Sequence, residues 1–513
     1  MRITVYDGAD SIGGNKIHIL ENDNGLFFDF GMNFARYSLY YQDFVGERPS
    51  RGIYDLWRLG LIPRLNIYRS DLLPNDLKAE ISTYHRIPIN AVLISHVHLD
   101  HVGNIAILYE DIPMIGSLVT MVILKALRDT GHGSHLGMGI PYYSPKQPKQ
   151  ENPSVLESKK MKTYKWRPVI LTESPNHESI EFLQKRVEGD LGKRVKRIEK
   201  GKIEELSATD IGFEIEAYSV DHSILGATGY IVNGDTSVAY TGDFRFHGGN
   251  ADATKEFIKA AKRASILITE GTRVGRDEEG NVSEMEVYLN AKKIAEEAKG
   301  LVIADFSARN FERLETFKRI AREVGRELVI TSKDAYFLYA LELATGKGYL
   351  DNVGIYENSR SSLRGWEQWV MERYEGLKVP PEELQRNPDN YILCFSFYDL
   401  PHLLDVNPKG GVYIYSSSEA FGEEQEFSFL RLWNWLQYFG FDVYGFRLNS
   451  TGKPVFEKGL HASGHVSREE LMRVIDEIDP DYIIPVHTEQ PGWFVDHWDE
   501  KVVVLQNGDS LEV

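Results

Sequence analysis

The chain has 513 residues, more than one compact core organises, so we expect two or three domains. Hydrophobic residues make up 42% of the chain and charged residues 26%, a composition that is ordinary for a globular α/β protein and excludes a disordered one. The formal net charge of -18 argues against a protein that coats nucleic acid with its whole surface, because neutralising phosphates needs clustered Lys and Arg.

The single cysteine and the N-terminal residues indicate the cellular compartment. Cys394 excludes an intramolecular disulfide framework, and its place in the apolar run YILCFSF favours a buried, inert thiol. The N-terminus, MRITVYDGAD, lacks a basic-then-apolar signal segment, and no apolar stretch approaches the length that spans a bilayer. We therefore expect a cytoplasmic protein, mature as written, with no membrane partner.

The first elements expected along the chain are three strands, with the sequences RITVY, KIHIL and LFFDF. Glycine turns at 12–14 and 24–25 separate them, which favours an antiparallel meander. Asp29 lies at the end of the third strand, and a further strand over 90–95 leads directly into His96.

The next segment, 130–205, is rich in Pro, Lys and Gly and shows little periodicity, so we expect an excursion from the core. From Pro141 to Lys202 there are fifteen Lys or Arg against eight Asp or Glu, an excess of seven positive charges in an acidic protein. A solvated surface is the commoner meaning of such a run, and a nucleic-acid contact is the alternative. Strand patterns resume at 213–220, 230–232, 238–240 and 266–269.

From about Ser283 onwards, helical patterns alternate with short apolar strands, which is typical of a parallel, doubly wound sheet. The expected helices are 283–299, 310–324 and one within 426–439. The expected strands are 301–305, 327–331, 391–397, 411–415 and 441–446. A last helix over 467–478 and a strand ending at His487 complete an α/β chain.

The strongest chemical signal is the run SHVHLDH, which begins at Ser95 and places four metal-ligand residues within six positions. On an extended segment, residues two apart point the same way, so His96 and His98 can bind one ion. If the chain then turns into a helix, Asp100 and His101 face a second ion. The apolar strand before the run makes a solvated polar loop the weaker alternative.

Two complete metal shells need further ligands from later in the chain. His222, Asp243 and His487 fit by position, because each follows a hydrophobic strand whose fixed backbone can aim a side chain.

These motifs, in this order, resemble the metallo-β-lactamase superfamily and its β-CASP nuclease branch. The resemblance implies an αββα sandwich with an inserted, Rossmann-like β-CASP domain. It implies one ion bound by His96, His98 and His222, and a second bound by Asp100, His101 and His487, with Asp243 bridging both. Asp29 matches a motif whose aspartate supports a ligand instead of binding an ion.

The β-CASP motifs are three single residues. Glu270 in LITEGT matches motif A, His465 in ASGH matches motif B, and His487 in IIPVHTE matches motif C. A histidine at motif C is typical of the RNA-acting members, and the sequence is most similar to ribonuclease J and its archaeal relatives. The implied domains are 1–272, with the basic excursion over about 141–205, then 273–440 for the β-CASP domain and 441–513 for the end of the first fold.

The resemblance implies a hydrolase in which two divalent ions generate the hydroxide that attacks an RNA phosphodiester bond, leaving 5′-phosphate products. The catalytic residues would be Asp100, Asp243, Glu270 and His465. Histidine-rich ligands favour zinc, with manganese as the alternative. The substrate would be single-stranded RNA, cut by 5′-to-3′ exonuclease action, endonuclease action or both, and a homodimer is left open.

Substrate phosphates have candidate contacts in hydroxyls and amides at helix starts and strand ends. These are Ser307, Arg309, Ser416, Ser417, Ser418, Ser463 and Gly464, and simple caps or turns are the alternative for each. His247, close after Asp243, is a further candidate. Three other functions compete: a DNA nuclease, a hydrolase of small esters or lactones, and an inactive scaffold, which would be expected to lack a ligand.

Overall fold

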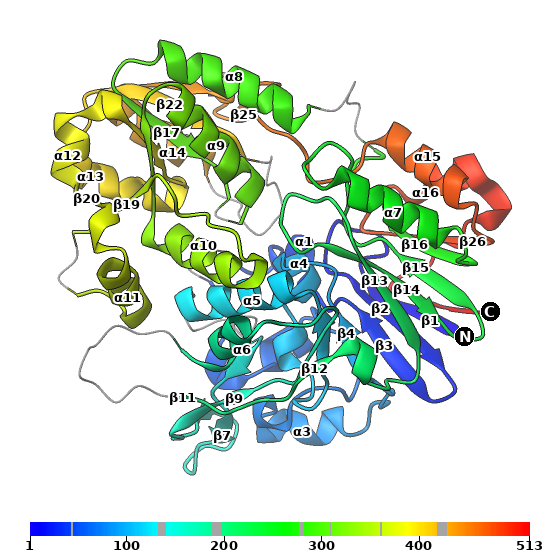
Figure 1. Ribbon diagram of the computed structural model, residues 1–513. Coiled ribbons are helices and arrows are strands. Elements are labelled where there is room, and N and C mark those ends of the chain that lie inside the picture. The colour runs from blue at the N-terminus through cyan, green and yellow to red at the C-terminus, as the bar shows by residue number, and fades with distance from the viewer. Residues whose placement is uncertain are drawn as a thin grey trace.

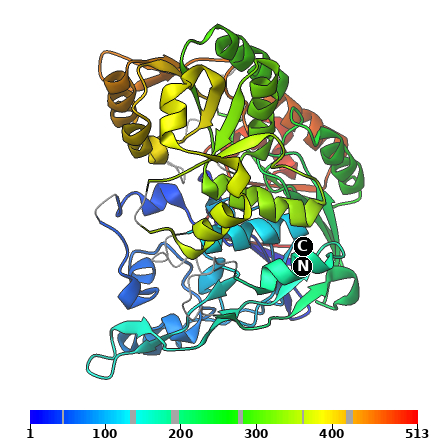
Figure 2. The same ribbon diagram turned by 60° about the vertical axis from the view of Figure 1, so that its left-hand side comes forward.

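The computed structural model describes residues 1–42, 45–131, 140–186, 197–275, 282–307, 309–359, 362–417 and 428–513. The molecule has two lobes that pack against each other (Figures 1 and 2). The first lobe is built around two sheets, and the second lobe is built around a third sheet. The two ends of the chain meet in the first lobe, where β1 (Arg2–Asp7) pairs with β27 (Ser510–Glu512) (Figure 1).

An eight-stranded sheet forms one layer of the first lobe. Its order is β12-β10-β5-β4-β3-β2-β1-β27. The expected antiparallel meander is confirmed by β1, β2 (Lys16–Glu21) and β3 (Asn24–Phe28). Strand β4 (Ala91–Leu93) runs parallel to β3, so the chain leaves both strands at the same edge of the sheet, where Asp29 and His96 follow.

The expectation of an excursion over 130–205 is partly wrong. Strands β10 (Val169–Leu171) and β12 (Ile203–Glu205) extend the eight-stranded sheet in parallel with β5 (Met114–Gly116). Three-residue strands are too short to show a periodicity, which is why the sequence pattern missed them. The other elements here are β6 (Tyr142–Tyr143), β7 (Lys146–Pro148), β8 (Leu156–Ser158), β9 (Thr163–Trp166), α6 (His177–Gln184) and β11 (Arg197–Ile198).

A five-stranded sheet forms the facing layer. It consists, in spatial order, of β13 (Glu214–Ser219), β14 (Thr228–Asn233), β15 (Ser237–Tyr240), β16 (Ile266–Glu270) and β26 (Tyr482–Val486). One apolar cluster between the sheets combines Ile17 and Phe28 with Tyr230 and Ile268. Helix α5 (Leu118–Thr130) contributes to the core outside the first sheet, and α7 (Ala251–Ala261) and α15 (Arg468–Ile478) pack outside the second. The expected αββα sandwich is therefore present.

The second lobe is inserted between two adjacent strands. Glu270 of β16 is in register with Val486 of β26, although residues 271–481 separate the strands in the chain. The inserted sheet is parallel throughout and has the order β20 (Lys378–Val379), β19 (Val353–Tyr356), β18 (Glu327–Ile330), β21 (Tyr391–Cys394), β17 (Leu301–Asp305), β22 (Gly411–Tyr415) and β23 (Phe441–Tyr444). This sheet continues past residue 440, the limit expected for the domain, and a hairpin of β24 (Phe446–Leu448) and β25 (Pro454–Phe456) follows it.

Helices cover the inserted sheet, and three of them match the helices expected over 283–299, 310–324 and 426–439. The covering helices are α8 (Glu284–Glu297), α9 (Phe311–Glu323), α10 (Ser332–Thr345), α11 (Gly365–Arg373), α12 (Pro381–Arg386), α13 (Leu403–Val406) and α14 (Phe429–Phe439). Shorter helices of the first lobe are α1 (Phe34–Tyr37), α2 (Tyr54–Arg58), α3 (Asn75–Ile81), α4 (Leu99–Val102) and α16 (Pro491–Trp498).

Helix α10 joins the lobes. It begins with a capping box between Thr331 and Asp334 and ends at Gly346, whose φ of 68° is the left-handed conformation that glycine adopts without strain. It packs against α5 of the first lobe (Figure 1). Within the described part of the chain, no helix is long and apolar enough to cross a membrane.

Candidate metal centre

The SHVHLDH segment leads from strand β4 into helix α4. The backbone bends at Ser95 and Val97, His98 before the helix is extended, and α4 then carries Asp100 and His101. Two of the side chains therefore leave the segment before the helix, and two leave its first turn. Four polar side chains thereby reach one edge of the sandwich.

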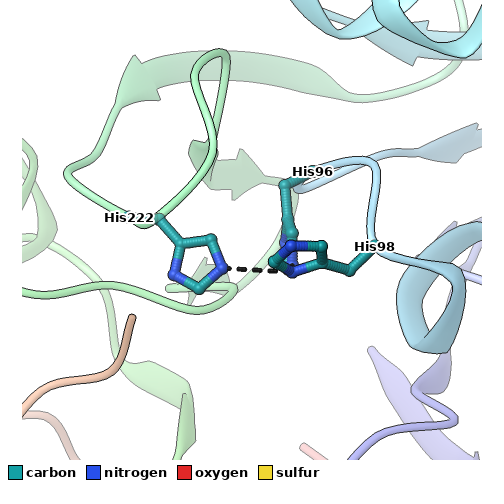
Figure 3. A group of neighbouring side chains, drawn as sticks. All are labelled: His96, His98 and His222. Atoms are coloured by element: carbon teal, nitrogen blue, oxygen red, sulfur yellow. Dashed lines mark hydrogen bonds between the residues drawn. The ribbon is translucent and has the colours of Figure 1, made fainter. Parts of the chain in front are cut away.

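Three histidines form the first group of the site (Figure 3). The Nδ1 atom of His98 lies 2.9 Å from Nε2 of His96 and 3.3 Å from Nε2 of His222. Two nitrogens that bind one tetrahedral zinc ion stand about 3.3 Å apart, given Zn–N bonds of about 2.0–2.1 Å. The three rings could therefore hold a single ion.

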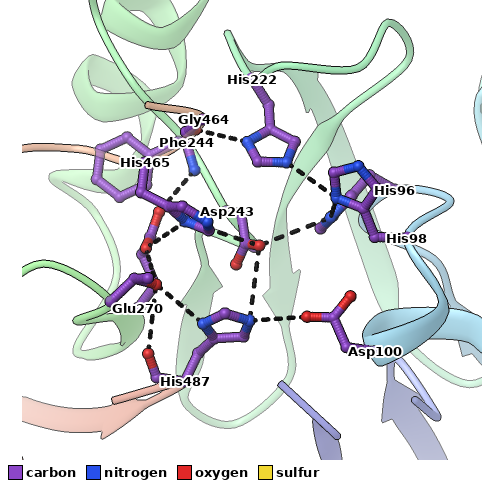
Figure 4. Close-up of polar contacts among 12 residues, drawn as sticks. His96, His98, Asp100, His222, Asp243, Phe244, Glu270, Gly464, His465 and His487 are labelled. Carbon is purple, nitrogen blue, oxygen red and sulfur yellow. Dashed lines mark hydrogen bonds and ion pairs between the residues drawn. The ribbon is translucent and has the colours of Figure 1, made fainter. Parts of the chain in front are cut away.

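A second group lies beside the first and consists of Asp100, His101 and His487. Figure 4 labels Asp100 and His487 of this group. His487 Nε2 is 3.2 Å and His101 Nε2 is 3.7 Å from Asp100 Oδ2. Asp243 lies between the groups, since its Oδ2 atom is 3.1 Å from His101 Nε2 and 3.6 Å from His96 Nε2. One carboxylate thus faces both possible ion positions.

Two buried polar atoms in this cluster support the fit of a cation. His101 Nε2 and Asp243 Oδ1 have no hydrogen-bond partner among the described residues. Buried polar groups are almost always satisfied, so each such atom calls for an explanation. A histidine ring nitrogen and a carboxylate oxygen are donor types that bind divalent metal ions.

The electrostatics of the histidines agree with this fit. Burial, and then the neighbouring imidazoles, hold the pKa values of His96 and His222 well below the usual range, so both rings are in the neutral form that binds metals. For His101, burial is outweighed by the carboxylates of Asp243 and Asp100, which raise its pKa. The carboxylates that favour a proton on His101 would favour a bound metal cation in the same way.

Asp29 contacts the ring of His101. The sequence motif assigned Asp29 a supporting role of this kind. Its Oδ2 atom accepts a hydrogen bond from His101 Nδ1 at 2.7 Å, which turns Nε2 of that ring toward Asp243. Ser95 and Tyr240 donate to the same carboxylate, with hydroxyl distances of 2.7 Å each. Asp29 has a φ of 56°, a strained conformation that these bonds hold in place.

Thr272 orients His487 and was not identified from the sequence. Its hydroxyl accepts from His487 Nδ1 at 2.9 Å and donates to Glu270 Oε2 at 2.5 Å. His487 itself has a φ of 52°, so its backbone is also strained at the end of β26. Ser95 and Tyr240 were missed in the same way, because a hydroxyl next to a motif carries no spacing signal of its own.

Glu270 and His465 form a pair beside the two groups (Figure 4). His465 Nδ1 donates to Glu270 Oε2 at 2.8 Å, and the same ring nitrogen is 3.8 Å from Asp243 Oδ2. The other oxygen of Glu270 accepts from the backbone amide of Phe244 at 2.9 Å. The His465 side chain is 21% exposed while Glu270 is buried, so the imidazole can meet a substrate in an orientation that Glu270 sets.

The expected phosphate contacts of the inserted lobe lie at the carboxyl ends of two paired strands. Ser307 and Arg309 follow β17, and Ser416 and Ser417 follow β22. Contrary to expectation, Ser416 is fully buried, and its hydroxyl is bonded to Arg313 and to the Leu460 carbonyl at 2.5 Å each. It therefore stabilises this loop and does not face a substrate. Ser418 lies outside the described residues.

The backbone of Ser463 and Gly464 approaches the side chains of the candidate metal centre. The Gly464 carbonyl accepts from His222 Nδ1 at 2.6 Å, and a Cβ atom at Gly464 would stand only 2.9 Å from the His222 ring. The Ser463 carbonyl accepts from Arg245 and from His247. The carbonyl groups of these two residues thus fix the side chains of His222, Arg245 and His247. Residue 464 must be glycine because its backbone lies so close to the His222 ring.

Comparison with known proteins gives one family match and several relatives. The model of the Zn-dependent metallo-hydrolase RNA specificity domain matches residues 455–492, which include His465 and His487. Ribonuclease J of Pyrococcus abyssi is 21% identical, with alignment over 100% of this chain and 97% of the relative. Ribonuclease J of Mycoplasma pneumoniae is 22% identical over 95% of this chain and 68% of the relative.

Other relatives are matched over a smaller share. Ribonuclease J of Mycoplasma genitalium is 26% identical over 54% of this chain, and the match spans only 46% of that protein. A crystal structure of a protein of unknown function from Enterococcus faecalis V583 aligns with a TM-score of 0.65 and 20% identity over 99% of both chains, which supports the fold. The chain therefore has the metallo-β-lactamase fold with a β-CASP insertion, and it is similar to ribonuclease J.

Proposed function

We propose that this protein is a metal-dependent ribonuclease that hydrolyses RNA phosphodiester bonds. The observation that carries the proposal is the position of Asp243, whose carboxylate faces His96 on one side and His101 on the other. Bound at these ligands, a pair of divalent ions would lower the pKa of water and offset the charge of the attacked phosphate. We propose zinc as these ions, because imidazole is the main ligand type, with manganese as the alternative.

The residues around the ions have separate tasks in this proposal. His96, His98 and His222 hold one ion, Asp100, His101 and His487 hold the other, and Asp29 keeps His101 in place. His465, partly exposed at the site and bonded to Glu270, contacts the phosphate or protonates the leaving oxygen. In this proposal the water oxygen attacks phosphorus and the bond to the 3′-oxygen breaks, so the products carry a 5′-phosphate and a 3′-hydroxyl, and no 2′,3′-cyclic phosphate forms.

The RNA substrate class is supported by the matched RNA specificity domain and by the ribonuclease J relatives. We propose single-stranded RNA, since a duplex would have to be opened before its backbone enters a buried ligand cluster. The test compares RNA and DNA oligomers of one sequence, with 5′-hydroxyl, monophosphate or triphosphate ends, labelled at each terminus in turn. Mononucleotides released from the 5′ end indicate exonuclease action, and internal fragments indicate endonuclease action.

Two substitutions test the assigned chemistry. Asp243→Asn removes the charge that faces both ions, and His465→Ala removes the exposed imidazole, so we expect each to lower kcat by at least about 100-fold while the fold persists. Chelation should abolish cleavage, and circular dichroism should remain that of the parent. Cleavage of DNA alone, or of esters or lactones alone, would refute the RNA assignment.

A further inference from the structure

A buried network of charged side chains connects the metal centre to the inserted lobe. Its central member is Arg245, which is fully buried and follows Asp243 by two residues. The guanidinium lies 3.4 Å from Asp221, 3.1 Å from Glu284 and 2.6 Å from Glu312. Asp221 precedes the ligand His222 in the chain, whereas the two glutamates belong to α8 and α9. One side chain therefore bonds to both lobes.

The network continues inside the inserted lobe. Glu284 also accepts two hydrogen bonds from Arg313, at 3.0 Å and 3.1 Å, and Arg313 in turn donates to the Leu460 carbonyl at 3.3 Å. Buried ion pairs contribute little net stability compared with apolar side chains of similar volume, because desolvation offsets their attraction. Such ion pairs can instead hold the chain in one conformation. Here they hold the segment that leads to His465.

Two side chains of this region hold the residue that lies two positions before His465. The Ser463 carbonyl accepts from Arg245 Nη1 at 3.1 Å and from His247 Nε2 at 2.8 Å. The Ser463 hydroxyl accepts from the amide of His465 at 3.2 Å, so a displacement of Ser463 is passed directly to the imidazole. Arg245 is also paired with Glu284, and the position of this segment is therefore tied to the docking of the inserted lobe.

We propose that Arg245 and His247 are positioning residues that place His465 beside the metal ligands, and that Glu284 makes this placement depend on the docked inserted lobe. The inference rests on the role proposed for His465 in RNA cleavage. Neither residue contacts the reacting atoms in this scheme. Their effect on the His465 imidazole passes through Ser463. The proposed cleavage of RNA would therefore depend on how the inserted lobe is docked.

The kinetic test uses three variants of the full-length, metal-loaded protein. Arg245→Lys keeps the charge but loses the planar fork, His247→Phe keeps the ring volume but loses the donor, and Glu284→Gln removes the charge shared by two arginines. We expect kcat for an RNA oligomer to fall about 10- to 100-fold, with KM changed less than about twofold, because misplacement by 1 Å costs about this much. In a His465→Ala background the same substitutions should change kcat less than about twofold.

A matched control breaks another buried bond between the lobes. Tyr336→Phe removes the hydroxyl that donates to Asp129 across the α5–α10 interface, at 2.5 Å, and this bond has no connection to Ser463. We expect its kcat to equal that of the parent protein. Bound metal, measured by mass spectrometry, should be unchanged in all four variants.

A spectroscopic test separates this inference from the proposed function. In protein with ¹⁵N-labelled histidine, the His465 signal is assigned from its loss in His465→Gln, and it should shift in the three network variants but not in Tyr336→Phe. If the parent protein fails to cleave RNA, the proposed function fails and this measurement still tests the placement. An unshifted His465 signal with parental kcat would overturn the inference. So would a loss of kcat that comes with metal loss or that persists in the His465→Ala background.

Discussion

Three histidines of the candidate metal centre are oriented by the group that the ring nitrogen on the far side contacts. Nδ1 of His222 donates to a backbone carbonyl, Nδ1 of His101 to a carboxylate, and Nδ1 of His487 to a hydroxyl. Fixing the proton on one nitrogen leaves a lone pair on the other, which is the form that binds a cation. The three partners differ in kind, so the three rings should differ in how easily they are disturbed.

Thr272 is the partner whose removal gives the clearest prediction. Thr272→Val keeps the side-chain shape but deletes the hydroxyl between His487 and Glu270, leaving His487 Nδ1 without its acceptor. We expect zinc to bind about 10- to 100-fold more weakly at the group that contains His487, as measured by competition with a chromophoric chelator. Thr272→Ser keeps the hydroxyl and is the control. Parental affinity in the valine variant would contradict the role assigned to Thr272.

At this scale, the sequence predicted which ligand-type side chains converge but not what orients them. His96 and Asp243 could be found because each follows an apolar strand, and strand ends in this fold gather at one edge. Thr272 and Tyr240 could not, since their role depends on which distant side chain the fold places beside their hydroxyl groups. Ser416 shows the reverse error, because its place at a strand end gave no sign that Arg313 would occupy its hydroxyl.

At the scale of helices and strands, periodicity decided what could be predicted. Helices α8 and α9 have one apolar face against the inserted sheet and were expected from that pattern. Helix α10 was missed because it is buried between two lobes and has apolar residues around most of its circumference. Amphipathic patterning identifies a helix at a surface, and α10 does not lie at one.

The end of strand β17 carries a buried carboxylate whose pKa gives a test by pH. Burial, together with the charge of Asp399, raises the pKa of Asp305 from 3.8 to about 7, although the Tyr413 hydroxyl donates to it. The folded protein therefore keeps a proton that the unfolded chain releases above pH 4. This contribution to stability is complete below about pH 4 and is lost as pH rises to about 7.

Asp305→Asn should remove this pH dependence, because the amide stays neutral and still accepts from Tyr413. Relative to the variant, the parent protein should lose stability between pH 4 and pH 7, by an upper limit on the order of 4 kcal/mol. Denaturant midpoints of both proteins across this range measure the difference. Asp442→Asn, which changes an exposed carboxylate on β23, is the control and should follow the parent. A constant difference between parent and Asp305→Asn would rule out the raised pKa.

At the scale of the whole molecule, the two lobes share one apolar core. The same cluster contains Ile123 of α5 and Leu338 of α10, and it extends into the interior of both lobes. A polar group is buried in this interface: Asp129 accepts from Tyr142 at 2.6 Å and from Tyr336 at 2.5 Å, and Lys125 pairs with it. Domains of one chain are expected to move relative to one another unless their interface is large and hydrophobic, and here one apolar cluster continues from one lobe into the other. We therefore expect the lobes to unfold together.

Tyr336→Phe tests this cooperativity. The substitution keeps the ring but removes a hydrogen bond to a charged acceptor, which contributes about 1.5–3 kcal/mol. For a chain of this size, such a loss lowers the unfolding midpoint by about 2 °C. Calorimetry should show a single endotherm in parent and variant, displaced as a whole, because the bond connects parts of one cooperative unit. Tyr438→Phe, at a side chain that is 76% exposed on α14, should leave the midpoint unchanged. Two separate endotherms, of which only one moves, would show that the shared core does not couple the lobes.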